Sequence, residues 1–124
     1  MTKDVLITIR RVHTVDEEDN DVEMIVRGDY YQKNGKHYVL YEELIEGFKE
    51  PVKNIIKITS TSMDITKKGT AITHMLFEKN RKNVSCYSTP FGEIVVGIQA
   101  NHFAVDEQAD SLKVNVDYSL DINY

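Results

Sequence analysis

The chain has 124 residues, of which 41% are hydrophobic, and a formal net charge of −5 at pH 7. This length fits one domain, residues 1–124, whose core needs no disulfide, and the single cysteine, Cys86, excludes an internal one. The acidic balance argues against non-specific binding to nucleic acid, because phosphates would be repelled. No apolar run is long enough for a signal peptide or a membrane span, so we expect a cytoplasmic protein without a membrane partner.

Two strands separated by an acidic stretch are predicted at the start of the chain. Residues 5–13 begin with three β-branched side chains at every second position, and residues 22–33 show a similar alternation. This period of two is typical of a strand with one buried face. The residues between them, 16–21, contain no apolar side chain, so we expect a solvated turn. A calcium loop is the alternative, because carboxylates suit calcium, but its glycine and ligand spacing are missing.

The dipeptide Asn34-Gly35 is the clearest local signal in the chain. Asn-Gly is preferred in two-residue type I′ turns, because both central residues need a positive φ. It therefore predicts an antiparallel hairpin that joins residues 22–33 to a strand at residues 37–45.

The middle of the chain repeats the same pattern of strands and turns. The predicted strands are residues 52–60, 63–67, 71–77, 84–88 and 93–103. Proline followed by glycine in Thr89-Pro90-Phe91-Gly92 predicts the turn of another hairpin. Gly97 lies inside a predicted strand, where glycine suggests a bulge, a bend or a close approach.

The last segment, residues 112–122, has the most regular alternation. Its apolar residues share one face: Leu112, Val114, Val116, Tyr118, Leu120 and Ile122. No segment shows a helical stripe of useful length, so about nine strands joined by short turns predict an all-β antiparallel meander. So many strands in so short a chain either stack as two sheets or close into a barrel, and closure removes the exposed edges.

Several short segments, in this order and spacing, resemble one known family. They are Gly28-Asp29-Tyr30-Tyr31, Gly35 with Tyr38, Tyr41 and Glu42, Ile56-Lys57-Ile58, Gly69 followed by Met75 and Phe77, residues 87–92 and residues 116–123. Together they resemble the YwiB-like family of small bacterial β-barrel proteins of unknown function. The resemblance implies a lipocalin-like (calycin-type) barrel of about 8–10 strands in a cytoplasmic setting, and it supplies no reaction.

Catalytic motifs are absent from the sequence. There is no GxSxG elbow, HExxH motif, phosphate-binding glycine loop or cysteine pair, so we expect no enzymatic activity and no cofactor. The four histidines are far apart, and their spacing predicts no metal site. The predicted strand 71–77 is flanked at opposite ends by two groups of basic residues, Lys67 with Lys68 and Lys79 with Arg81 and Lys82, so they form no single surface for nucleic acid.

One short segment concentrates side chains that carry hydroxyl or carboxylate groups, and these are Tyr38, Tyr41, Glu42 and Glu43. Residues alternate sides along a strand, so Tyr41 and Glu43 share one face while Tyr38 and Glu42 share the other. An inward carboxylate needs a partner, and Lys57 between isoleucines could provide it. The alternative is that these lysine and glutamate side chains point outward and pair across strands at the surface.

These features predict a non-enzymatic barrel that binds a small apolar or amphipathic ligand in its interior. The residues expected to line or anchor the ligand are Tyr41, Glu42, Lys57, Met75, Phe77, Tyr87 and Tyr118. The alternative is a solid, fully packed barrel that acts as an interaction or assembly module through surface loops such as residues 90–92. A hydrolase or isomerase built around Tyr41 and Glu42 is the only enzymatic form we consider.

Overall fold

The structure is a computed structural model that describes residues 2–15, 18–47, 49–69, 72–89 and 92–123. Within these ranges the side chains of residues 11–15, 18–22, 87–89 and 123 are not described. The described residues form nine strands and no helix, and hence no helix that could cross a membrane. The strands are β1 (Lys3–Val15), β2 (Glu18–Lys33), β3 (Lys36–Glu43), β4 (Val52–Ile58), β5 (Ser62–Lys68), β6 (Ile72–Glu78), β7 (Lys82–Thr89), β8 (Gly92–Glu107) and β9 (Leu112–Asn123).

Strands that follow one another in the chain pair antiparallel and form two sheets, β1–β6 and β7–β9. Within the described residues no backbone ladder joins β6 to β7. Side chains of β7 bridge this seam instead, because Asn83 donates to the carbonyl of Leu76 at 3.3 Å and the Ser85 hydroxyl donates to the carbonyl of His74. The predicted all-β antiparallel meander is therefore confirmed.

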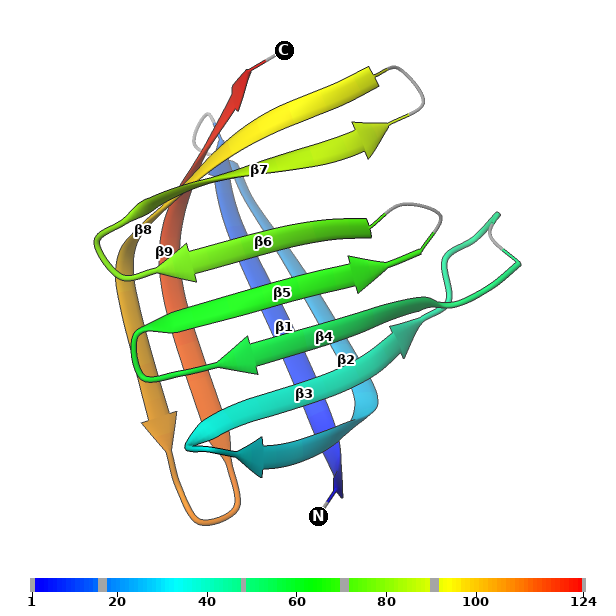
Figure 1. Cartoon of the computed structure of the whole chain (residues 1–124), viewed down its shortest axis with the longest axis vertical. Coiled ribbons are helices and arrows are strands. Elements are labelled where there is room, and N and C mark those ends of the chain that lie inside the picture. Colours follow the sequence, from blue (N-terminus) through cyan, green and yellow to red (C-terminus); the bar gives the residue numbers. More distant parts are fainter. Residues whose placement is uncertain (1, 16–17, 48, 70–71, 90–91, 124) are drawn as a thin grey trace.

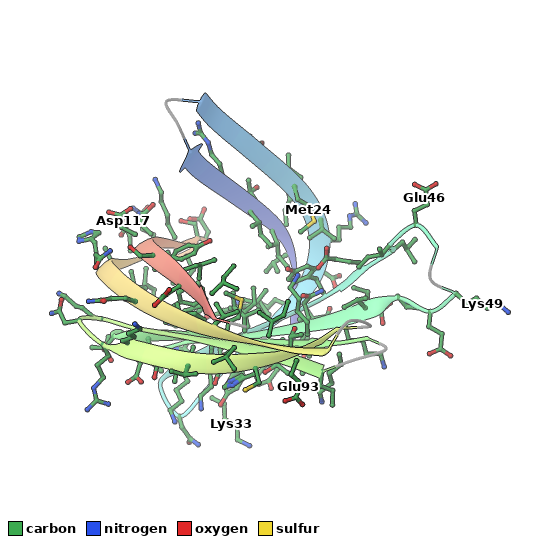
Figure 2. The ribbon with its side chains drawn as sticks, turned by 90° about the horizontal axis from the view of Figure 1, so that it is seen from above. Met24, Lys33, Glu46, Lys49, Glu93 and Asp117 are labelled. Atoms are coloured by element: carbon green, nitrogen blue, oxygen red, sulfur yellow. The ribbon has the colours of Figure 1, made fainter. Side chains whose placement is uncertain are left out.

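The strands form two layers with the core between them. In Figure 1, β3–β7 run across the view, and β1, β2, the lower part of β8 and β9 cross behind them at a steep angle. Figure 2 shows that the far end of the β1–β2 hairpin stands away from the other strands. Two clusters make up most of the buried core of the described residues. One contains Phe77, Val96, Ile98 and Ala100, and the other contains Tyr41, Ile56 and Ile58. Side chains from β1, β2, β8 and β9 pack against the second cluster, so both layers contribute to it.

Closure into a lipocalin-like barrel is not confirmed. Among the described residues, β1 pairs only with β2 and β9 pairs only with β8, so no ladder joins the two ends of the meander. Closure would also need a kind of pairing that the ladders of this fold do not use. Each strand of a meander reverses direction, so the first and the ninth run the same way. Closing the barrel would therefore need a parallel pair, whereas every ladder between these strands is antiparallel.

The Asn34-Gly35 turn is confirmed. Both residues have positive φ, 53° and 75°, and the flanking Lys33 and Lys36 lie opposite each other in the β2–β3 ladder. This is the geometry of a type I′ turn, and it sets the register of the hairpin.

Two other turn predictions have mixed outcomes. Thr89 lies opposite Gly92, which confirms the predicted β7–β8 hairpin, while residues 90–91 lie outside the described residues. The solvated turn predicted for the acidic stretch is wrong for residues 18–21, which extend β2 and pair with β1. Backbone pairing in a long hairpin outweighs the low β-propensity of aspartate and asparagine there. Residues 16–17 lie outside the described residues.

Gly97 occupies a close approach between strands. A Cβ at this position would lie 2.8 Å from Cε of Lys82 on β7, so the predicted close approach is confirmed. The register shift in the β8–β9 ladder falls between Ala100 and His102, which leaves Asn101 as the bulge residue. A bulge bends and twists its strand, and β8 curves strongly in Figure 1.

Candidate functional site

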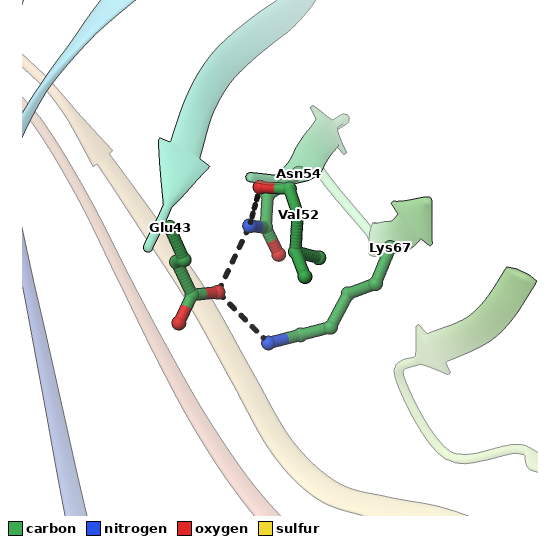
Figure 3. A network of polar contacts seen from close by, with 4 residues as sticks. All are labelled: Glu43, Val52, Asn54 and Lys67. Atoms are coloured by element: carbon green, nitrogen blue, oxygen red, sulfur yellow. Dashed lines mark hydrogen bonds and ion pairs between the residues drawn. The ribbon is translucent and has the colours of Figure 1, made fainter. Parts of the chain in front are cut away.

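A polar cluster lies on the inner face of the sheet where β3 ends, β4 begins and β5 ends (Figure 3). Nδ2 of Asn54 donates to Oε1 of Glu43 at 2.9 Å, and Nζ of Lys67 donates to the same oxygen at 3.2 Å. The Asn54 amide also donates to the carbonyl of Val52 at 3.4 Å. One carboxylate oxygen therefore links three strands and gives the ammonium group of Lys67 a partner.

Strand alternation and register bring these side chains together. On β3, Tyr41 is buried and Glu43 points to the same face two residues later. The ladders set Tyr41 opposite Asn54, and Asn54 opposite Lys67. Because residues opposite one another in a ladder share a face, the apolar row at Ile56 continues into this polar row at the rim of the sheet.

Asn54 carries an acceptor that nothing among the described residues satisfies. The residue is 1% exposed, and its Oδ1 is buried without a hydrogen-bond partner. A buried polar atom left without a partner costs about 1–3 kcal/mol. The cluster therefore combines a carboxylate, an ammonium group and an acceptor that still needs a donor.

A cleft of about 570 Å³ opens at the same end of the sheet. It is lined by Ile45, Lys49, Glu50, Pro51, Val52, Lys53, Lys67, Lys68, Gly69 and Thr73. We call it the lysine cleft. Lys67 belongs to both the polar cluster and the cleft, so the two are continuous. One wall is the β3–β4 connection, which extends beyond the strands at Glu46 and Lys49 in Figure 2. The volume lies within the range of small-molecule sites, about 300–1,000 Å³.

Two of the expected anchor residues, Glu42 and Lys57, point away from the core. Ile56 and Ile58 are buried, so Lys57 between them faces outward. Glu42 is exposed, on the face of β3 opposite to that of Glu43. The sequence left open which glutamate points inward. The structure places Glu43 there and gives it Lys67, not Lys57, as its lysine partner.

The residues expected to line a cavity pack against one another. Phe77 is buried, and Met75 packs against its cluster. The ring of Tyr118 meets that of Phe77 edge to face, with centroids 5.0 Å apart and planes at 69°. Tyr41 is buried at the polar cluster, and the side chain of Tyr87 lies outside the described ones. The structure therefore places Met75 and Phe77 in the packed core, with the ring of Tyr118 at its exposed edge.

Sequence reasoning missed a second polar network, centred on His37. This histidine is buried, with Nδ1 2.6 Å from the Tyr30 hydroxyl and Nε2 2.7 Å from Oε1 of Glu107. A neutral imidazole can accept at Nδ1 from the phenol and donate from Nε2 to the carboxylate. Burial, and then the charge of Glu107, raises the pKa of Tyr30 above its usual 10.0. The alternation of His37 with Tyr41 along β3 is the signal that could have found it.

No metal site is evident among the described side chains, in which no three His, Cys, Asp or Glu residues gather closely enough to hold an ion. The His37 network links β2 and β3 of one sheet to β8 of the other.

Comparison with known proteins places the chain in a family. A crystal structure of ywiB protein from Bacillus subtilis matches this fold with a TM-score of 0.85 and 19% sequence identity, covering 97% of this chain and 83% of that chain. No curated protein matches the chain. The model of the family described as "Domain of unknown function (DUF1934)" matches residues 7–124. The protein therefore belongs to the DUF1934 family, and the YwiB-like resemblance of its sequence is confirmed.

Proposed function

We propose that this protein binds a small amphipathic molecule at the lysine cleft and catalyses no reaction. The observation that carries the proposal is the cleft itself, which holds about 570 Å³ and is lined by apolar residues, among them Ile45, Pro51 and Val52, together with lysines. It adjoins the polar cluster, in which Oδ1 of Asn54 finds no hydrogen-bond donor among the described residues. Small-molecule sites typically combine apolar lining with a few convergent polar groups of this kind.

The rim of the sheet is a better place for the ligand than the interior. Phe77, which was expected to line a cavity, is 3% exposed and packs with the fully buried Ile98 and Ala100, so side chains fill the core around it. In the cleft, an apolar tail can lie on Ile45 and Val52, with its polar end toward Lys67, which shares the inner face of the sheet with Val52.

We also propose that the protein works in the cytoplasm. Cys86 is an exposed free thiol, which suits the reducing cytoplasm. The net charge of −5 supports a small ligand rather than nucleic acid or a membrane surface as the partner.

Binding can be tested by titrating the ¹⁵N-labelled protein with octyl glucoside below its critical micelle concentration. We expect shifts of backbone amides at residues 45, 52–53 and 67–69, and weaker binding in Ile45→Ser, which loses apolar lining. Leu44→Ser is the matched control, since Leu44 is 90% exposed and lies outside the cleft lining. Shifts spread over the whole surface, or equal losses in the two variants, would contradict the proposal.

A second candidate is the assembly module, acting through the end of β9. Tyr118, Leu120 and Ile122 lie on the apolar face of this strand, yet they are 38%, 47% and 49% exposed. The core is already packed without these side chains, so we propose that they contact another protein molecule.

A further inference from the structure

We infer that the end of β9 pairs with the same strand of a second copy of this chain, about a two-fold axis at Leu120. The inference rests on the second candidate function and names its partner. Residues 112–116 of β9 alternate between half-buried and exposed, whereas every residue from 117 to 122 is exposed. Among the described residues, only β8 forms a ladder with this strand. The end of β9 therefore has two exposed faces and one open edge.

The apolar face of β8 continues onto β9 and is uncovered there. The ladder pairs three residues of β9 with three of β8, namely Tyr118 with Ala100, Leu120 with Ile98 and Ile122 with Val96. The β8 residues are at most 3% exposed, whereas those of β9 are at least 38% exposed. Because residues opposite one another in a ladder share a face, one apolar surface runs from the core to the edge of the sheet.

A second copy of β9 fits both the open edge and the apolar face. An added strand gives backbone partners to the edge and covers the side chains that face the core. A two-fold axis makes the two copies of β9 antiparallel, as in every ladder between the strands of this fold. Since such an axis uses the same patch on both copies, the pairing needs no second uncovered surface.

The aspartates of β9 exclude two registers of this pairing. An axis at Leu120 sets Asp121 opposite Ser119 of the second copy, and Asp117 opposite position 123, an asparagine. An axis at Ser119 would set Asp117 opposite Asp121, and an axis at Asp121 would set this aspartate opposite itself. Like charges directly opposite one another destabilise a sheet, so an axis at Leu120 is favoured over both neighbours.

The apolar residues favour Leu120 over the next position that avoids this repulsion, Tyr118. An axis at Leu120 sets Tyr118 opposite Ile122 and Leu120 opposite itself, so all three exposed side chains gain an apolar neighbour. An axis at Tyr118 would instead use Val114 and Val116, which already pack against the core clusters. The inferred contact therefore stays within the exposed end of the strand.

Disulfide cross-linking reads this register in a Cys86→Ser background, which lacks the exposed native thiol. Opposite Cα atoms in an antiparallel ladder lie about 4.5–5.5 Å apart, within the disulfide range of about 4.4–6.8 Å. We expect Leu120→Cys, oxidised with copper phenanthroline, to form covalent dimers about tenfold or more faster than Val84→Cys, because pairing raises the effective thiol concentration. Val84 is the matched control, a 67% exposed apolar residue on β7.

A second pair of variants, Ser119→Cys and Asp121→Cys, keeps all three apolar residues of the contact. Each variant alone sets its thiols diagonally, about 7–8 Å apart, whereas a mixture of the two sets them directly opposite. We therefore expect the mixture to form covalent dimers faster than either variant alone, on non-reducing gels. The ¹⁵N spectrum of each variant checks that its fold is retained.

The outcomes separate the inference from the second candidate function. Cross-linking of Leu120→Cys no faster than that of Val84→Cys, with a mixture no faster than its components, would overturn the two-fold pairing and leave contact with a different protein standing. Faster cross-linking of Ser119→Cys or Asp121→Cys alone than of the mixture would overturn the register. Self-association that Leu120→Lys leaves intact would overturn both the inference and the second candidate function.

Discussion

Gly28 lies on β2, where three strands approach closely. A Cβ there would collide with the backbone carbonyl of Leu40 and lie 2.5 Å from Cδ1 of Ile7 and 3.2 Å from Cβ of Tyr41. A backbone atom on β3 cannot move aside without disturbing the ladder. We therefore expect Gly28→Ala to lower the free energy of unfolding by about 1–3 kcal/mol, as overpacked cores do, in chemical denaturation.

Gly97→Ala is the control for this substitution. Its Cβ would meet Cε of Lys82, near the end of a flexible side chain that can move away. We expect a loss below about 1 kcal/mol. Equal losses in the two variants would show that close approach to the backbone is not what requires glycine at position 28.

Ionisation of Tyr30 should make the free energy of unfolding depend on pH in the alkaline range. Its pKa in the folded protein is raised above 10.0, first by burial and then by Glu107. Folding thus favours the neutral phenol, and this contribution is complete below the unfolded pKa of 10.0 and is lost as pH rises through the folded pKa. We expect the free energy of unfolding to fall less steeply between about pH 9 and 11 in Tyr30→Phe than in the wild type.

Urea denaturation across this pH range measures the effect. Glu107→Gln removes the smaller of the two causes that raise the pKa of Tyr30. The fall of its free energy of unfolding with pH should therefore be steeper than in Tyr30→Phe and less steep than in the wild type. A decline in Tyr30→Phe as steep as in the wild type would show that this phenol does not contribute to it.

At the scale of elements, β9 combines an exposed apolar face with an edge that pairs with no strand among the described residues. Self-association would cover both, so the assembly candidate predicts a mass that rises with concentration in sedimentation equilibrium. Leu120→Lys should return the protein to monomer, because a charge in an apolar contact is costly. Val84→Lys, which alters a 67% exposed residue on β7, should leave the association unchanged.

A wild-type protein that remains monomeric over the whole concentration range would exclude self-assembly through β9. Association that persists in Leu120→Lys and is lost in Val84→Lys would move the contact to β7.

For the whole molecule, much of the fold follows from local sequence signals. Alternation predicted the strands in order, and Asn34-Gly35 predicted one hairpin register. The inward glutamate could not be chosen, because β3 carries large apolar or aromatic residues on both faces, such as Leu40 and Tyr41. The pairing of Glu43 with Lys67 depends on two successive registers across β4, and no local pattern specifies them.

Local sequence patterns also do not predict whether the first and last strands of the meander pair. Whether β1 meets β9 depends on the path of β8, whose bulge at Asn101 has no glycine to mark it. The His37 network depends on contact between residues 70 positions apart in the chain, counted from the numbering of His37 and Glu107.

The strictly sequential pairing has a consequence for synthesis of the protein. β1–β6 span residues 3–78 and find all their ladder partners among themselves, so a nascent chain can complete this sheet before the remainder leaves the ribosome. Phe77, however, is covered by Val96, Ile98 and Ala100 of β8. During translation the backbone of the first sheet is therefore paired before its apolar face is covered, and arrival of β8 ends the period in which that face is open to other chains.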